Sequence, residues 1–245
     1  MRPPRTQRLS VAGPAGEIEA LLETPADDEI AGAILDGECR PEGLGAGKGA
    51  EQSAQPARFG VVCHPHPLYG GTLDNKVVYT LARAFVELGV PCIRFNFRGV
   101  GRSAGRYDEG RGETADALAV IAYGRERWPA ASLWLAGFSF GGAVAVRAAA
   151  DARPERLVAV APGITRVAME GIASPACPWL IVQGDADDVI EPAPVLEWAR
   201  RQSTVPTVRQ LCGAGHFFHG RLHELRQVVL DFLGPQKAPR PTASE

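Results

Sequence analysis

The sequence predicts an α/β fold built on a mostly parallel, twisted sheet with helices on both faces. Two observations support this prediction. Short apolar runs alternate with helical patterns from about residue 59 onward. The runs are apolar on both faces, which is typical of parallel strands covered by helices on both sides. The chain of 245 residues is long enough for one unit of this kind, which we expect to span residues 1–234.

Turn residues and apolar patterns divide the chain into successive strands and helices. Residues 7–12 and 17–23 flank Gly13-Pro14-Ala15-Gly16, which predicts an antiparallel hairpin at one edge of the sheet. Apolar runs bounded by turn residues predict strands at 59–63, 90–97, 132–136, 157–160, 179–182 and 207–212. Helical spacing predicts helices at 74–88, 113–127, 141–151, 194–201 and 221–233. Gly89 ends the first of these helices, and Trp128-Pro129 ends the second.

Two segments fall outside this alternation. Residues 27–57 are rich in Gly, Ala, Glu and Gln, and we interpret them as a surface excursion long enough to be mobile. Residues 235–245 contain three prolines, and we expect a disordered tail there.

Composition excludes several classes of function. The 28 acidic and 26 basic residues give a net charge of −2, which provides no basic surface for nucleic acid or an anionic membrane. No apolar run approaches the length of a membrane span, and the charged start leads into no apolar signal segment. The five cysteines are widely spread without a CxxC pair, so we expect free thiols rather than disulfides or a zinc site. We therefore expect a cytoplasmic protein that needs no metal or cofactor.

The pattern Gly-x-Ser-x-Gly occurs twice, around Ser103 and around Ser139. A nucleophile elbow needs a strand, a tight turn and then a helix packed closely against that strand. Ser139 follows the strand at 132–136 and precedes the small residues Gly141-Gly142-Ala143-Val144-Ala145, which suit such a helix. Ser103 is followed by 106–110, which contains no helix of small residues. The sequence therefore favours Ser139 as the nucleophile.

Partners for this serine are expected later in the chain, in the order acid and then histidine, on loops at the carboxyl ends of strands. The loop after the strand at 179–182 carries Asp185, Asp187 and Asp188. The loop after the strand at 207–212 carries His216. His219 and His223 fall in the following turn and the last helix, where surface or core roles are expected.

Together these motifs resemble the α/β-hydrolase superfamily over about residues 59–233. The elbow at Ser139, the Gly184-x-x-Asp187 spacing and the Gly215-His216 pair match its three catalytic loops, and residues 96–103 resemble its Gly-rich segment. Residues 64–76 are similar to a small cap-less bacterial subgroup of dienelactone-hydrolase-like and esterase-like proteins. The resemblance implies that Asp187 is the acid, with Asp188 and then Asp185 as alternatives, and that His216 is the base. The excursion at 27–57 is not part of the family pattern.

The chemistry requires donors for the oxyanion of the tetrahedral intermediate. One is expected to be the backbone N–H of Phe140, the residue after the nucleophile. The second is expected from the loop after the strand at 59–63, where Pro65 and Pro67 have no N–H. The remaining candidates are His66, Leu68 and Tyr69. His64 and His66 could instead hold this loop by hydrogen bonds, and Tyr69 could line the pocket.

The resulting interpretation is a carboxylesterase-like serine hydrolase that cleaves a small-molecule ester through an acyl-enzyme intermediate. Only 18 residues, 161–178, separate two strands at the point where related folds insert a helical cap. We therefore expect an open site and small or short-acyl esters. Thioesters, lactones and amides can be cleaved by the same machinery and stay as alternatives.

Three other classes compete with this interpretation. His64-x-His66, the acids at 185–188, and His216, His219 and His223 could supply the ligands of a metallohydrolase. Gly99-Val100-Gly101 follows a strand but lacks the helix and the acid of a dinucleotide-binding fingerprint. A binding protein without activity on the same scaffold would not need all three triad residues at these loops.

Overall fold

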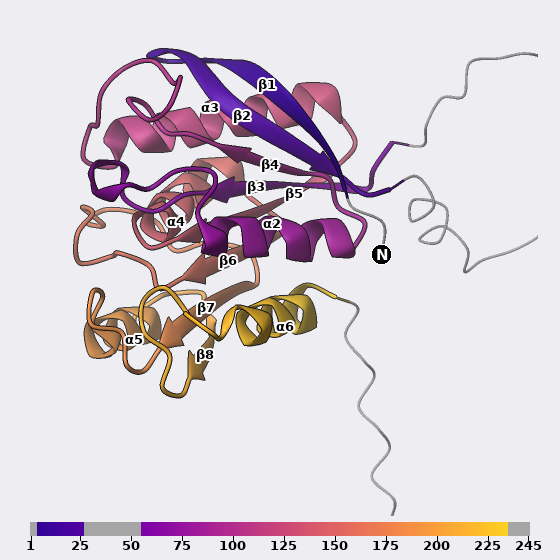
Figure 1. Cartoon of the computed structure of the whole chain (residues 1–245). Coiled ribbons are helices and arrows are strands. Elements are labelled where there is room, and N and C mark those ends of the chain that lie inside the picture. Colours follow the sequence, from indigo (N-terminus) through magenta and orange to yellow (C-terminus); the bar gives the residue numbers. More distant parts are fainter. Residues whose placement is uncertain (1–3, 27–54, 235–245) are drawn as a thin grey trace, which may run out of the picture.

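An eight-stranded sheet forms the centre of the computed structural model, which describes residues 4–26 and 55–234. Its order is β1-β2-β4-β3-β5-β6-β7-β8, and only β2 pairs antiparallel, with β1 and β4. The strands are β1 (Arg5–Gly13), β2 (Gly16–Thr24), β3 (Arg58–Cys63), β4 (Cys92–Phe95), β5 (Ser132–Phe138), β6 (Arg156–Val160), β7 (Trp179–Gly184) and β8 (Thr207–Leu211). The predicted fold class is confirmed, with the antiparallel hairpin at one edge (Figure 1).

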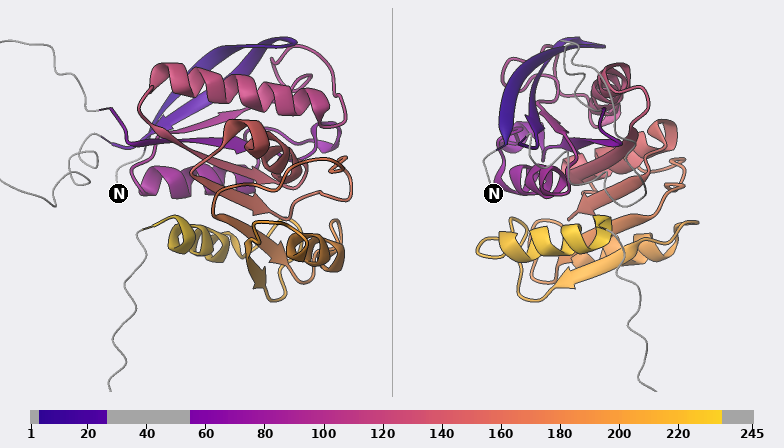
Figure 2. Two further views of the ribbon diagram at one scale, coloured as in Figure 1. Left: turned by 180° about the vertical axis from the view of Figure 1, so that it is seen from behind. Right: turned by 90° about the vertical axis from the view of Figure 1, so that its right-hand side faces the viewer.

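Helices cover both faces of the sheet (Figure 2). They are α2 (Lys76–Glu87), α3 (Arg111–Arg127), α4 (Phe140–Ala152), α5 (Pro192–Arg200) and α6 (Leu222–Leu233), with a 3-10 turn, η2 (Pro67–Tyr69). Buried side chains of α2 and α6 belong to one hydrophobic cluster, and those of α3, α4 and α5 belong to another. The parallel sheet therefore buries apolar surface in two layers, which accounts for the strands that are apolar on both faces.

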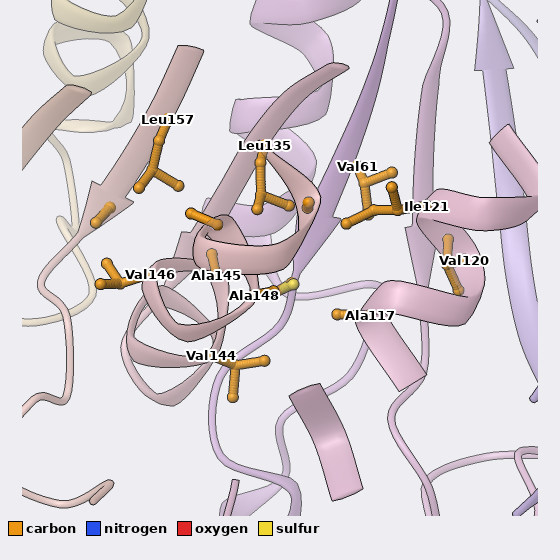
Figure 3. Close-up of a cluster of buried hydrophobic side chains, with 14 of the residues drawn as sticks. Val61, Ala117, Val120, Ile121, Leu135, Val144, Ala145, Val146, Ala148 and Leu157 are labelled. Atoms are coloured by element: carbon orange, nitrogen blue, oxygen red, sulfur yellow. The ribbon is translucent and has the colours of Figure 1, made fainter. Parts of the chain in front are cut away.

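Alternation along the strands divides the core between these layers. Val61 of β3 lies beside Leu135 of β5, and both belong to the cluster packed on α3 and α4 (Figure 3). The next residues along each strand, Val62 and Ala136, belong to the opposite cluster. Because successive side chains of a strand point to opposite faces, the register places every strand residue in one layer or the other.

Every predicted strand and helix boundary lies within two residues of the observed one, and β4 alone differs by two residues at both ends. We expected a strand over 90–97, whereas β4 is only Cys92–Phe95. Beyond it, the N–H of Asn96 donates to the carbonyl of Glu19 at 2.8 Å, and that of Phe97 donates to Nε2 of His64 at 2.9 Å. The N–H groups of Asn96 and Phe97 therefore do not pair with β3, because one bonds to β2 and the other to a histidine side chain. The predictions for 27–54 and 235–245 concern residues outside the described part.

The six strands from β3 to β8 all run parallel, so their carboxyl ends share one edge of the sheet. The connection between β6 and β7, residues 161–178, contains turns but neither helix nor strand. This edge is therefore not covered by a lid. None of the helices in residues 4–26 and 55–234 has the length and hydrophobicity needed to cross a membrane.

A buried ion pair joins the hairpin to the sheet and to a loop at this edge. Arg94 of β4 and Glu23 of β2 are 4% and 2% exposed, and the guanidinium Nε and Nη2 each donate to the carboxylate at 3.2 Å. Arg94 Nη1 also donates to the carbonyl of Leu73, whose N–H donates to Asn96 Oδ1 at 2.9 Å. The pair thus fixes the segment that follows η2.

We expect Arg94→Ala to lower the free energy of unfolding by about 3–5 kcal/mol, because it leaves the Glu23 carboxylate buried without a partner. The control is Arg201→Ala, which removes an exposed pair with Glu197 and should cost at most about 0.5 kcal/mol. Urea unfolding followed by circular dichroism measures both losses. Similar small losses in the two variants would contradict a structural role for the buried pair.

Candidate active site

Ser139 occupies a strained turn between β5 and α4. Its backbone has φ 55° and ψ −121°, a conformation that a non-glycine residue adopts only when its surroundings enforce it. The N–H of Ser139 donates to the carbonyl of Val160 at 2.8 Å, and its carbonyl accepts from the N–H of Gly163 at 2.9 Å. These bonds fix the turn to the end of β6 and present the hydroxyl at the carboxyl edge of the sheet.

The glycines on either side of Ser139 are required by close backbone contacts. A Cβ at Gly137 would lie 2.0 Å from the carbonyl oxygen of Gly141. A Cβ at Gly141 would lie 2.3 Å from the carbonyl oxygen of His64, which follows β3. No side chain fits at either position, so the Gly-x-Ser-x-Gly pattern here reflects the packing of α4 against β5 and β3.

Ser103 has a different environment. Its hydroxyl donates to the carbonyl of Asn96 at 2.7 Å and accepts from the N–H of Glu19 at 3.0 Å. Both bonds connect the Gly-rich loop to the strands beside it. The hydroxyl therefore holds the loop, and no histidine contacts it.

The structure brings Ser139, His216 and Asp187 together. Nε2 of His216 lies 3.0 Å from Oγ of Ser139, and Nδ1 lies 2.8 Å from Oδ2 of Asp187. The three residues are only 7%, 3% and 5% exposed. Because a carboxylate accepts only, the Nδ1 position carries the proton, and Nε2 accepts from the serine hydroxyl. This arrangement can remove the hydroxyl proton during attack on an electrophile.

Four hydrogen bonds hold the Asp187 carboxylate. Oδ1 accepts from the N–H groups of Val189 and Ile190 at 2.9 and 2.8 Å, and Oδ2 accepts from His216 and from Nε2 of Gln183 at 3.0 Å. Burial acts to raise the pKa of Asp187, but the bonds from His216, Ile190 and Val189 outweigh it and hold this pKa below its usual range. The carboxylate therefore stays ionised beside the imidazole.

Close contact between two loops sets the distance from the acid to the histidine. A Cβ at Gly184 would lie 2.1 Å from the carbonyl oxygen of Ala214, and the same oxygen accepts from the N–H of Ala186 at 3.1 Å. The carboxylate of Asp185 accepts from the N–H of Gly213 at 2.5 Å. Asp185, the second alternative for the acid, holds the histidine loop instead.

Sequence reasoning missed Gln183, which is fully buried at the end of β7. Its Nε2 donates both to Asp187 and, at 3.1 Å, to the carbonyl of Ile190. A glutamine directly after the apolar run 179–182 is the signal that could have found it. Of the other acids, Asp188 is exposed and makes no contact with His216.

Two backbone N–H groups are available beside Ser139. Leu68 N–H donates to Nδ1 of His66 at 3.2 Å and Tyr69 N–H donates to the carbonyl of His66 at 3.1 Å, so both are used within η2. The N–H groups of Phe140 and His66 have no partner among the residues that the structure describes. Both residues line the cavity next to Ser139. Of the candidate oxyanion donors, Phe140 and His66 therefore stay free for a ligand.

His64 holds the loop after β3, as the alternative interpretation had it. Its Nε2 accepts from the N–H of Phe97 at 2.9 Å, and Nδ1, which must then carry the proton, donates to the carbonyl of Pro65 at 2.6 Å. Complete burial lowers the pKa of His64 to about 3. His64 is thus a neutral structural residue, and its backbone lies against Gly141.

A cavity of about 240 Å³ opens beside Ser139 and His216. Apolar and aromatic side chains form much of its wall, namely Tyr69, Phe140, Val189, Ile190 and Phe217. Tyr69 and Phe217 are also exposed, so the cavity opens to solvent without a cover. Such a cavity can hold a small, partly apolar ligand next to the serine.

Residues proposed as metal ligands do not converge. Within residues 4–26 and 55–234, no group of three or more His, Cys, Asp or Glu side chains is placed to hold a metal ion. Cys63, Cys92, Cys177 and Cys212 have free thiols, and Cys39 lies outside the described residues. The ring of His219 stacks on Phe217 with centroids 5.8 Å apart. His223 is exposed on α6.

Comparisons with known proteins agree with this fold. Residues 61–172 match a family model described as the alpha/beta hydrolase fold. The protein RP471 of Rickettsia prowazekii is 34% identical over 204 residues, which cover 79% of this chain and 85% of the relative. XC6422 from Xanthomonas campestris, described as an α/β serine hydrolase without lid, is 34% identical with a TM-score of 0.79, over 98% of this chain and 99% of that one. An α/β serine hydrolase homologue from Coxiella burnetii is 39% identical with a TM-score of 0.78, over 93% and 97%.

The depressed pKa of His64 predicts a specific loss of stability in acid. The folded protein keeps this ring neutral down to pH of about 3, whereas the unfolded chain protonates it near 6.5. The contribution of this ring to the free energy of unfolding is therefore fully present above pH 6.5 and is lost as the pH falls toward 3. We expect the free energy of unfolding to fall less steeply in His64→Asn than in the wild type between about pH 7 and pH 5. Urea unfolding at each pH measures the slope.

The exposed His223→Asn variant is the control for this experiment and should keep the wild-type slope. Slopes, not absolute stabilities, are compared, because His64→Asn also alters two hydrogen bonds. An unchanged slope in His64→Asn would contradict the neutral, buried state of this ring.

Proposed function

The chain belongs to the α/β-hydrolase superfamily, in its group without a lid, and we propose that it cleaves carboxylic esters with small or short acyl groups. The family supports hydrolase chemistry. The observation that carries the proposal is the hydrogen-bonded chain from Asp187 through His216 to Ser139, at 2.8 and 3.0 Å. A hydroxyl is a weak nucleophile unless a base takes its proton during attack, and this chain supplies that base.

In the proposed reaction, Oγ of Ser139 attacks the ester carbonyl while Nε2 of His216 takes the hydroxyl proton. Asp187 accepts the Nδ1–H bond throughout and stabilises the imidazolium without taking a proton itself. The N–H groups of Phe140 and His66 stabilise the oxyanion. His216 then gives its proton to the departing alcohol, which leaves an acyl-Ser139 ester. In the second half of the reaction, water attacks this ester while the same imidazole takes its proton. His216 then returns that proton to Oγ of Ser139 as the carboxylic acid product leaves.

We expect Ser139→Ala to reduce hydrolysis of a p-nitrophenyl ester by at least about a thousandfold, because the nucleophile is lost. Ser103→Ala is the matched control. It should keep nearly all activity and lose about 1–3 kcal/mol of stability, because the N–H of Glu19 and the carbonyl of Asn96 lose a partner. Initial rates and urea unfolding test both variants.

Covalent labelling provides a second readout for the same two serines. A fluorophosphonate should modify Ser139, as read by peptide mass spectrometry, and should not modify Ser103. Full activity in Ser139→Ala, or labelling of another serine in the wild type, would contradict the proposed nucleophile.

Acyl-chain length should discriminate this open site from that of a lipase. We expect kcat/KM for p-nitrophenyl esters to be highest for acetate through butyrate and to fall for decanoate and longer chains. The cavity of about 240 Å³ holds a short acyl group, and a longer chain extends into water because no lid covers it. When the concentration of a long-chain ester is raised past its solubility limit, the rate should not rise abruptly. An abrupt rise would indicate the interfacial activation that is typical of a lipase with a lid. A maximum at long chains would contradict the proposal, and a higher rate on thioesters or lactones of equal size would reassign the substrate.

A further inference from the structure

Arg166 is the charged residue of the cavity beside Ser139. Among the described residues that line it, no other Arg, Lys, Asp or Glu is present. Asp187 lies behind His216 and does not line the cavity. The ligand therefore meets one permanent positive charge and no negative one.

Backbone bonds fix the turn that carries Arg166 to the nucleophile. Gly163 donates its N–H to the carbonyl of Ser139 at 2.9 Å, and Arg166 donates its N–H to the carbonyl of Gly163 at 3.0 Å. The guanidinium Nη2 donates to the carbonyl of Val189 at 2.9 Å, on the loop that follows Asp187. Arg166 is itself exposed, and these bonds place its positive charge on the wall of the cavity.

Most of the hydrogen-bonding capacity of this guanidinium is unused. Arg94 and Arg98 bond to the buried carboxylates of Glu23 and Asp116. Arg166 forms no ion pair with an acidic residue in the described part of the chain, and the Val189 carbonyl takes only one of its several N–H donors. A guanidinium left in this state matches a carboxylate, which it can bind with two parallel hydrogen bonds.

Other groups in the cavity also favour an anion. Asn75 lines it, and its Oδ1 already accepts from the N–H groups of Val77 at 2.9 Å and Val78 at 3.4 Å, so the side chain retains its NH₂ donors for a ligand. His66 also lines the cavity, and burial and then the charge of Arg166 lower the pKa of its imidazole. The lining residues that the structure describes therefore offer a ligand N–H donors and no carboxylate.

We propose that Arg166 binds a carboxylate on the substrate, so that the preferred substrates are esters bearing a free carboxylate on the acyl or the alcohol side. This specificity rests on the proposed esterase function. Arg166 is a binding residue here, and the hydrolytic step stays with Ser139 and His216.

Matched ester pairs test this proposal. On the acyl side, mono-p-nitrophenyl glutarate is compared with p-nitrophenyl valerate, in which a methyl group replaces the carboxylate. On the alcohol side, 4-carboxyphenyl acetate is compared with 4-methylphenyl acetate. Because leaving groups differ within the second pair, the quantity compared is the ratio of kcat/KM values in the wild type and in each variant.

For at least one pair, Arg166→Gln should lower the ratio of charged to neutral substrate by about tenfold, the lower end for a charge-assisted hydrogen bond in a solvent-accessible site. The neutral esters should be hydrolysed at nearly the wild-type rate. Arg166→Lys should retain part of the preference, since it keeps the charge but not the planar fork. Raising the salt from about 0.05 to 0.5 M should reduce the wild-type ratio.

The control variant is Arg200→Gln, which removes an exposed arginine of α5 that does not line this cavity and should leave both ratios unchanged. Neutral esters hydrolysed normally with unchanged ratios in Arg166→Gln would overturn the specificity and leave the esterase function intact. Equal loss on charged and neutral esters would also overturn it. If the wild type hydrolysed none of the four esters, the proposed function itself would fail.

Discussion

The close approach of α4 to β5 and β3 is the constraint on which the site depends. Gly137 and Gly141 allow backbone atoms to come nearer than any side chain permits. One consequence is the positive φ of Ser139, whose strain of about 1–3 kcal/mol is sustained by the hydrogen bonds to β6 and by the buried, alanine-rich helix. The other consequence is the orientation of the first turn of α4, whose N–H of Phe140 is left without an internal partner beside the serine. A single packing contact thus sets the nucleophile and one of the donors.

A second close backbone contact fixes the distance between the acid and the base. His216 connects this part of the site to Ser139. Gly184 and Ala214 bring the two loops into backbone contact, so the carboxylate and the imidazole are positioned before any substrate binds. His216 is itself buried, and neighbours hold its ring from several sides. Its ring lies 4.9 Å from that of Phe138 and 5.0 Å from that of Phe217, and its nitrogens bond to Asp187 and Ser139. The imidazole is therefore placed by the rigidity of its neighbours, which suits a group that must exchange protons with both substrate and serine.

The sequence predicted the sheet, its helices and the convergence of three side chains, because each depends on a local pattern. Apolar runs identify strands, and the small residues after Ser139 identify the helix that must approach closely. The sequence could not predict the second oxyanion donor or the role of Asp185, because both depend on the conformation of loops. The N–H groups of Leu68 and Tyr69 are excluded as donors only by the turn at η2, and Asp185 differs from its neighbour Asp187 only in the direction that its loop gives it. Arg166 belongs to no recognisable sequence motif. It stands out only in the structure, because the described residues that line the cavity with it include no other Arg or Lys and no Asp or Glu.

The distribution of charge around the cavity at the carboxyl edge of the sheet affects both substrate binding and the rate of the proposed reaction. Among the described residues, no Asp or Glu lines the cavity, and the carboxylate of Asp187 behind His216 accepts hydrogen bonds from four donors. In the proposed mechanism, two sets of groups attract negative charge in the cavity: the backbone N–H donors beside Ser139 and the guanidinium of Arg166. They act at different steps of the reaction. The N–H groups of Phe140 and His66 meet a full negative charge only once the tetrahedral intermediate forms, so they stabilise the transition state selectively. A substrate carboxylate on Arg166 is equally charged before and after attack, so that contact contributes to KM, while kcat depends on the elbow. Different elements then carry specificity and catalysis, namely the turn after β6 and the turn before α4. The hydrogen bond from Gly163 to Ser139 joins these two turns.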